Sequence, residues 1–177
     1  MFLQTSKGFV LMALSLEDKL RGASILELVT GISSINSDIY VNIVERDARG
    51  SYSVNVRKKS ILSKSASFGL FLKSSNKRRS PWQYSFTKDH QMEIEHLRRS
   101  FDETFILFLN GEDGVACINY AQLKQVLDDN FEEVEGVRVS RKIRESYRIN
   151  GRDGNLSRTL PRNSYPESIL DWIKTSL

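Results

Sequence analysis

The stretch GLFLKSSNKRRSPWQYSF, residues 69–86, decides the fold. It begins with a continuously apolar run that ends at Lys73, which is typical of a strand buried on both faces of a sheet. A basic loop follows, and from Trp82 to Phe86 aromatic and polar residues then alternate, which predicts a second, shorter strand. We therefore expect a central strand that presents one lysine at its end, beside a basic loop.

The residues before this stretch predict a helix and a hairpin. Ser15 followed by Asp18 has the spacing of a capping box, so a helix should begin at Leu16 and extend to about Val29, although residues 23–31 also fit a strand. Polarity alternates along residues 39–44 and 51–57, on either side of the turn sequence DARG, which predicts a β-hairpin. The polar residues 58–67 are expected to form a loop.

The residues after it predict a second layer. Thr87 should cap a helix that runs to about Ser100, with His90 on its apolar side in a core or capping role. Residues 104–109 are typical of a core strand, residues 115–118 of a strand that pairs back on it, and residues 119–128 of a capped helix. A strand near residues 134–139 and a final helix from Ser164, with a capping box to Glu167, complete the chain.

These elements predict an α/β (α+β) fold in which helices flank a mixed central sheet. We expect a core of residues 1–135 and a basic C-terminal extension of residues 136–177 that ends in a short helix, the two forming one compact unit. The apolar side of that helix carries Ile169, Trp172 and Ile173. Packing on the chain's own core is the simpler role for this helix, and docking on a protein partner is the alternative.

Composition indicates a globular protein of one domain. The chain has 177 residues, of which 40% are hydrophobic and 27% charged, and its single cysteine, Cys117, excludes an internal disulfide and fits a buried strand position. Two histidines are too few for an imidazole metal cluster. The apolar run Gly8–Leu14 is shorter than a membrane span and no cleavage site follows it, so we expect a terminal strand, no membrane association and a cytoplasmic protein.

Charge is segregated along the chain. Residues 102–135 hold nine acidic side chains and one basic side chain, Lys124, whereas residues 138–162 hold eight basic side chains against Glu145 and Asp153. Such segregation produces local fields that the net charge of +4 hides. The second basic region could extend the surface of the first basic loop, or it could pair with the acidic stretch and cancel its field.

The order of elements resembles the core of the PD-(D/E)XK nuclease superfamily, and most closely the small archaeal Holliday-junction resolvases. The resemblance covers residues 15–128 and rests on the buried strand that ends at Lys73, the aromatic strand, the capped helix and the next apolar strand. It implies a restriction-endonuclease-like core in which the third strand carries a Glu-x-Lys motif. The two acids and the lysine of such nucleases act with Mg²⁺, which prefers oxygen ligands.

The acids of that motif are missing here. Phe71 stands where the family's glutamate would be, and the family's aspartate would fall near Asn55 or Arg57, so only Lys73 remains. Glu17 or Glu27 of the first helix could supply a third carboxylate, but one carboxylate does not form a two-ligand site. The resemblance therefore implies a nuclease-like fold that has no catalytic residues and holds no metal or other cofactor.

We predict a non-catalytic nucleic-acid-binding module, such as an accessory subunit of a DNA-processing or defence system. Cations neutralise phosphates and exposed aromatic rings can stack on bases, so the basic loop beside the aromatic strand suits DNA or RNA. A solvated loop next to two core aromatic residues is the simpler interpretation of the same pattern. The predicted contacts are Lys73, Lys77, Arg78, Arg79, Trp82, Tyr84, Arg141, Lys142 and Arg144.

Two other functions fit the sequence. The chain could be a protein-interaction subunit of a larger complex that docks through its acidic region or through Ile169, Trp172 and Ile173. It could also be a Mg²⁺-dependent nuclease whose carboxylates are rearranged, and the candidates are then Asp38, Glu45 and Asp47. Mg²⁺ is expected only under this last alternative.

Overall fold

The computed structural model describes residues 14–36, 38–59, 64–131 and 133–177, and nearly all of the expected terminal strand at Gly8–Leu14 lies outside them. Five strands form a sheet in the order β1-β2-β3-β5-β6, in which β3 and β5 are parallel and the other pairs antiparallel. The predicted mixed central sheet is thus confirmed. Its strands are β1 (Ile39–Glu45), β2 (Ser51–Lys58), β3 (Ser65–Ser74), β5 (Glu103–Leu109) and β6 (Val115–Asn119).

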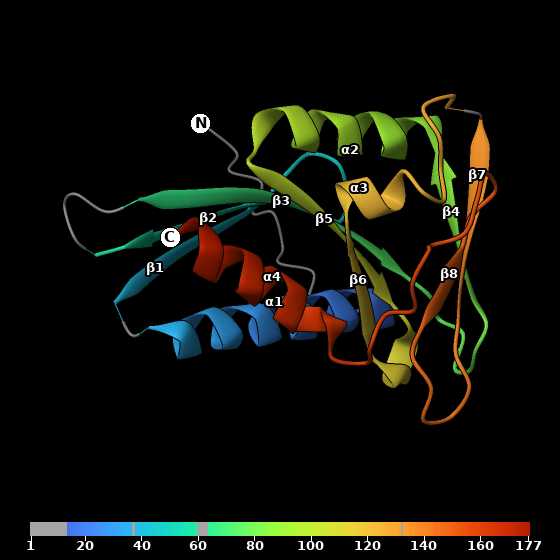
Figure 1. Ribbon diagram of the computed structural model, residues 1–177, viewed down its shortest axis with the longest axis horizontal. Helices are drawn as coiled ribbons and strands as arrows, with labels where there is room; N and C mark the ends of the chain where they lie inside the picture. The colour runs from blue at the N-terminus through green and yellow to red at the C-terminus, as the bar shows by residue number, and fades with distance from the viewer. Residues whose placement is uncertain (1–13, 37, 60–63, 132) are drawn as a thin grey trace, which may run out of the picture.

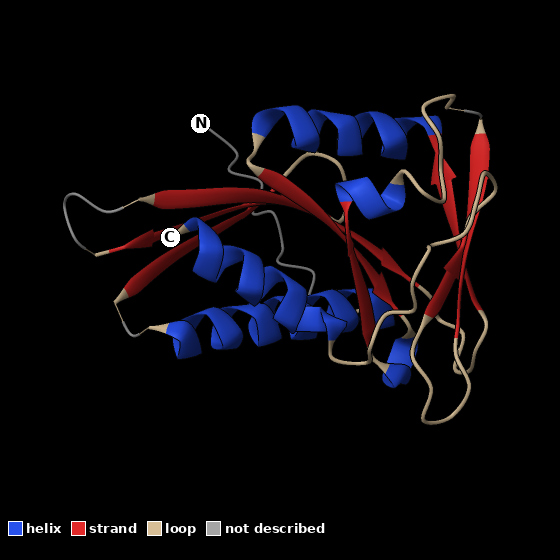
Figure 2. Ribbon diagram, viewed as in Figure 1, coloured by secondary structure: helices blue, strands red, loops and turns tan. Residues whose placement is uncertain are grey.

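Helices and a second sheet cover the two faces of the central sheet (Figures 1 and 2). The helices α1 (Leu16–Ile35) and α4 (Ser164–Ser176) lie on one face, and α2 (Lys88–Ser100) lies on the other. An antiparallel sheet of β4 (Trp82–Thr87), β7 (Val134–Ser140) and β8 (Arg148–Asn150) packs on the same face as α2. The expected boundary at residue 135 falls inside β7, which pairs with β4 from Val134 to Val139.

The strand β3 contributes to a hydrophobic core on each face of the sheet, as its apolar run predicts. Leu70 and Leu72 face the core that α1 and α4 cover, whereas Phe71 faces the core beneath α2 and the second sheet. Each of these side chains is at most 1% exposed. The end of β3 is therefore held rigidly from both sides, and Lys73 is positioned with it.

Local capping explains where two of the helices begin. The Ser15 hydroxyl accepts a hydrogen bond from the Asp18 amide at 3.1 Å, and the Asp18 carboxylate accepts one from the Ser15 amide, which confirms the predicted capping box. Thr87 forms the same kind of box with His90, which confirms α2 and the capping role of that histidine. The helix α1 extends to Ile35, six residues beyond the prediction.

Two predicted helix features are wrong because tertiary contacts override local sequence. The helix after Asn119 covers only Tyr120–Leu123 (α3), since the Val126 carbonyl accepts a hydrogen bond from the Asp153 amide instead of continuing a helical ladder. The box expected between Ser164 and Glu167 does not form. The Ser164 hydroxyl instead accepts a hydrogen bond from the Cys117 amide at 3.4 Å.

The C-terminal helix packs on the chain's own core, as the simpler of the two predictions has it, and docking of a partner through this helix stays a prediction. Ile169 and Ile173 are fully buried. The Trp172 ring lies 5.6 Å from the Phe68 ring and 5.9 Å from the Phe105 ring, in edge-on geometry. None of the described helices has the length and the apolar composition that crossing a membrane requires.

Candidate functional site

Lys73 lies at the carboxyl end of β3, at the edge of the sheet where β3 and β5 run parallel. Its Nζ atom is 3.5 Å from His90 Nδ1 and 5.6 Å from the centre of the Phe86 ring. Burial lowers the pKa of Lys73, and the nearby Arg21 guanidinium lowers it further, while Glu17 acts in the opposite direction. The ammonium group is therefore held in a half-buried position among other charged groups.

A recess of about 180 Å³ opens beside Lys73. Three elements besides β3 wall it: Glu17 and Arg21 come from the first turns of α1, Arg49 from the turn between β1 and β2, and His90 from α2. The Thr87 amide donates a hydrogen bond of 3.0 Å to His90 Nδ1, so the neutral ring carries its proton on Nε2. Burial and the charge of Lys73 both lower the pKa of His90, which keeps the ring neutral at pH 7.

The strand register shows which residue of β2 lies beside Phe71. Asn55 and Arg57 pair with residues near the start of β3, whereas Phe71 pairs with Ser51. The Ser51 hydroxyl donates a 2.6 Å hydrogen bond to Glu93 of α2. The fully buried Phe71 and its partner Ser51 thus bring no carboxylate to this end of the sheet.

The carboxylates near the recess are engaged by arginines. Glu17 lies 2.5 Å from Arg21 and 3.2 Å from Arg49, and the oxygen of Glu93 that binds Ser51 also accepts a 2.8 Å hydrogen bond from Arg46. Among the described residues, Glu17 is the one carboxylate that lines the recess. Mg²⁺ prefers several oxygen ligands, so this donor set does not fit it.

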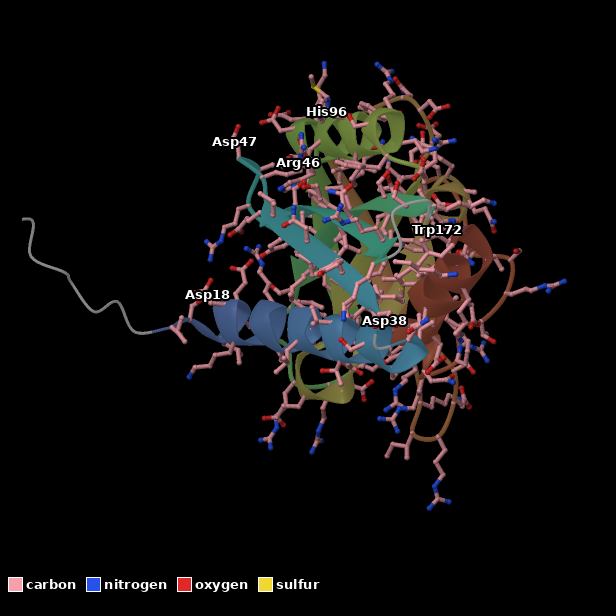
Figure 3. The ribbon with its side chains drawn as sticks, turned by 90° about the vertical axis from the view of Figure 1, so that its left-hand side faces the viewer. Asp18, Asp38, Arg46, Asp47, His96 and Trp172 are labelled. Carbon is pink, nitrogen blue, oxygen red and sulfur yellow. The ribbon has the colours of Figure 1, made fainter. Side chains whose placement is uncertain are left out.

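The rearranged acids that the sequence offered lie elsewhere. Asp38 is 3.4 Å from Lys59, and Glu45 accepts a hydrogen bond of 3.3 Å from Tyr52. Figure 3 shows Asp38 well away from Asp18, which marks the start of α1. Asp38, Glu45 and Asp47 are not among the residues that line the recess.

The basic loop between β3 and β4 is exposed at Lys77, Arg78 and Arg79. Trp82 and Tyr84, in contrast, are 1% and 3% exposed, so the predicted stacking of these rings on bases is wrong for this conformation. The Trp82 indole donates a hydrogen bond of 2.8 Å to the Lys77 carbonyl. Alternation along β4 turns both rings into the core, where Trp82 anchors the loop.

Arg141 forms a structural ion pair, and its predicted contact with nucleic acid stays a prediction. Its guanidinium donates two hydrogen bonds, of 2.6 and 2.5 Å, to the Asp113 carboxylate, and its side chain is 9% exposed. The Tyr147 hydroxyl donates a third, of 2.9 Å, to the same carboxylate. The Arg141 amide donates to the Ser80 hydroxyl at 3.0 Å and so ties the second basic region to the first basic loop.

A groove joins the two basic regions on the outer face of the second sheet. One part, of about 230 Å³, is lined by Ser80 and Pro81 of the first region and by residues of the second. It continues into a part of about 560 Å³, and Arg138 lines both. We call this the arginine groove; its basic side chains are Arg138, Arg141, Lys142, Arg148 and Arg152, and Arg144 is exposed nearby, two residues beyond Lys142.

Three carboxylates form a separate group, in which Asp128 follows α3, Glu135 lies near the start of β7 and Asp153 follows β8. Ligand atoms of Asp128, Glu135 and Asp153 lie within 4.8 Å of one another. Asp153 accepts a hydrogen bond of 3.0 Å from the Asp128 amide, and the buried Glu135 binds the Gln91 side chain. These contacts give the group a structural role in connecting α2 and the two turns.

Comparisons with known proteins find no match. No family model matches the sequence, and the searches of curated proteins and of solved structures give no similar protein. The resemblance to PD-(D/E)XK nucleases therefore rests on the order of the elements and on the position of Lys73. Function has to be argued from the residues of the recess and of the arginine groove.

Two residues of the recess, Arg21 and Arg49, were missed from the sequence. Glu17 and Arg21 have the i,i+4 spacing of an ion pair, which indicates that they share one face of α1. Arg138 and Arg148 lie at outward positions of strands in which buried and exposed residues alternate. Arg49 had no local signal, because only the fold brings its turn beside the end of β3.

Proposed function

We propose that the chain is a nucleic-acid-binding module without catalytic activity, built on a nuclease-like core. The observation that carries the proposal is the convergence of two basic segments, 61 residues apart in sequence, at the link between Ser80 and Arg141. The pairing of Trp82 with Val139 holds the same two segments together through the backbone. A single surface thus combines the basic loop with the arginine groove.

The charge balance of this surface favours a polyanion. The surface carries six cations, three on the basic loop and three in the arginine groove, against two carboxylates, Glu112 and Glu145. Each carboxylate lies 3.8–3.9 Å from one arginine, and these exposed contacts are weak. The six cations are Lys77, Arg78, Arg79, Arg138, Lys142 and Arg148.

The polar groups of the groove suit contact with a phosphate backbone. Three polar side chains line the groove, those of Gln83, Ser85 and Asn150, and they can donate hydrogen bonds to phosphate oxygens. Such contacts position a nucleic acid but do not read its base sequence. Gly136 leaves the middle strand without a side chain, and nothing lies within 4 Å of the position that its Cβ would take. We therefore expect binding that depends on salt and discriminates little between sequences.

Fluorescence anisotropy with labelled DNA and RNA tests the proposal. The double variant Arg138→Ala/Arg148→Ala should weaken binding at least tenfold and reduce the magnitude of the salt slope by about 2, since each lost phosphate contact removes about one released counterion. The triple variant Lys77→Ala/Arg78→Ala/Arg79→Ala should act in the same direction.

A matched control removes two cations elsewhere. Arg99 and Lys174 are exposed on α2 and α4, so the variant Arg99→Ala/Lys174→Ala changes net charge equally while leaving the proposed surface intact. It should bind nearly as the wild type does. If the groove variant and the control bind alike, the arginine groove is not the nucleic-acid site.

A further inference from the structure

Arg21 is placed to receive an anion in the recess beside Lys73. The residue is 8% exposed, and Glu17 is the one acceptor that the described part of the chain gives its guanidinium. The Nε atom has no hydrogen-bond partner among the described residues. A buried guanidinium whose donors are incompletely paired is costly, so the wall of the recess favours a ligand that brings acceptor oxygens.

The surrounding backbone brings two further cations to the same place. Gly50 has a φ of 83°, and a Cβ there would lie 2.8 Å from the Leu72 carbonyl oxygen and 3.0 Å from Arg21 Nη2. The absence of a side chain lets the turn approach the guanidinium, and this turn carries Arg49. Lys73 completes the set from the end of β3.

The net charge of the recess favours a terminal phosphomonoester over an internal phosphodiester. The three cations exceed Glu17 by two charges, and Asp18, which is 41% exposed, lies 3.4 Å from Arg49 at the outer side. A terminal phosphomonoester carries about −1.5 to −2 at pH 7, whereas an internal phosphodiester carries one negative charge. His90 adds a polar ring to the lining of the recess.

We propose that this recess binds the terminal phosphomonoester of a nucleic-acid strand. The inference rests on the proposed function and adds the end of the strand as a recognised group. Four elements wall the recess, which admits one phosphate group more readily than a phosphodiester with a nucleoside on each side. The basic loop leads from Ser74, at the recess, to Ser80, at the arginine groove, so one strand can occupy both.

The test compares one oligonucleotide with a 5′-phosphate, with a 3′-phosphate and with hydroxyl groups at both ends. Wild-type protein should bind one phosphorylated form about tenfold more tightly than the unphosphorylated form, which is the effect of one charge-assisted hydrogen bond or ion pair. Preference for either end supports the proposal and identifies that end. Equal affinity for all three forms would overturn it, even if the proposed function holds.

Two variants assign the preference to the recess. Arg49→Ala alters an exposed side chain and should not affect folding, and Lys73→Met keeps the aliphatic length of the half-buried lysine. Each should reduce the preference for the phosphorylated end to less than threefold, whatever affinity it also loses for the unphosphorylated form. If both variants keep the preference, the phosphorylated end of the strand binds outside the recess and the inference is wrong.

The groove variant separates this inference from the proposed function. Arg138→Ala/Arg148→Ala should weaken binding of all three oligonucleotides equally and retain the preference for a phosphorylated end. Inorganic phosphate is the final probe, because a free phosphate shares the chemistry of the strand end. If it binds the recess as tightly as the phosphorylated oligonucleotide does, the ligand is a small phosphate and the inference is wrong.

Discussion

Replacing Asp113 should destabilise the protein far more than replacing its neighbour Glu112. Asp113→Ala removes two hydrogen bonds from Arg141, of 2.5 and 2.6 Å, and leaves that guanidinium, whose side chain is 9% exposed, without its counter-charge. Hydrogen bonds to charged groups contribute about 1.5 kcal/mol or more each, so we expect a loss of about 3 kcal/mol. For a chain of this length the melting temperature should fall by about 6–12 °C.

The free energies of unfolding are measured by urea denaturation, and they are compared between wild type and variants that have equal m-values. Glu112→Ala is the control, because its oxygen is 3.8 Å from Arg78 and both side chains are more than four-fifths exposed, so the cost should stay below about 0.5 kcal/mol. Arg141→Met should cost about 2 kcal/mol, and the double variant with Asp113→Ala should cost less than the sum. Equal effects of Asp113→Ala and Glu112→Ala would refute the structural role of this pair.

The same pair predicts a pH dependence. Burial acts to raise the pKa of Asp113, but the hydrogen bonds from Arg141 and Tyr147 outweigh it and hold the pKa below its usual value. Because the folded pKa is the lower one, the contribution to stability is complete above the unfolded pKa of about 3.9 and is lost as the pH falls through the folded value. The difference in stability between wild type and Asp113→Ala should therefore shrink below about pH 4.

Three further changes test the packing. Trp172→Ala should cost about 2–3 kcal/mol through lost ring contacts with Phe68 and leave the size-exclusion volume unchanged, whereas an unchanged melting point would contradict the observed position of α4. Gly69→Ala should cost about 1–3 kcal/mol in urea unfolding, since its Cβ would lie 2.8 Å from that of Leu97, and a neutral result would mean that α2 can move away. Burial raises the pKa of the Cys117 thiol, so a thiol reagent should label it only after unfolding; rapid labelling of native protein would show that β6 is accessible.

Much of the fold was predictable because its signals are local. The apolar run before Lys73 and the Thr87 cap depend on neighbours in sequence. The helix α2 has the predicted bounds, whereas β3 begins at Ser65, inside the loop expected over residues 58–67. The cap at Ser164 failed because its hydroxyl binds the backbone of Cys117, 47 residues away. Contacts of this kind leave no trace in local spacing.

The candidate sites were harder to predict because charge alone does not show what a side chain contacts. Arg141 and Lys142 are adjacent in sequence, yet the first is buried against Asp113 and the second is exposed. Similarly, local sequence does not show that Arg21 of the first helix is buried, whereas the fold places it at the recess beside Lys73. Basic composition thus identified the region, and the fold determined which of its cations are accessible.

The contact between α1 and α4 has a consequence for the order of folding. The Tyr165 hydroxyl donates a hydrogen bond to the Ser24 carbonyl, 141 residues away in sequence, and Leu170 packs closely against Gly31. The strands of the central sheet are synthesised before α4, so the part of the sheet that α4 covers stays open until residues 164–176 have left the ribosome. Nascent chains that lack α4 should therefore expose this apolar surface to chaperones and proteases.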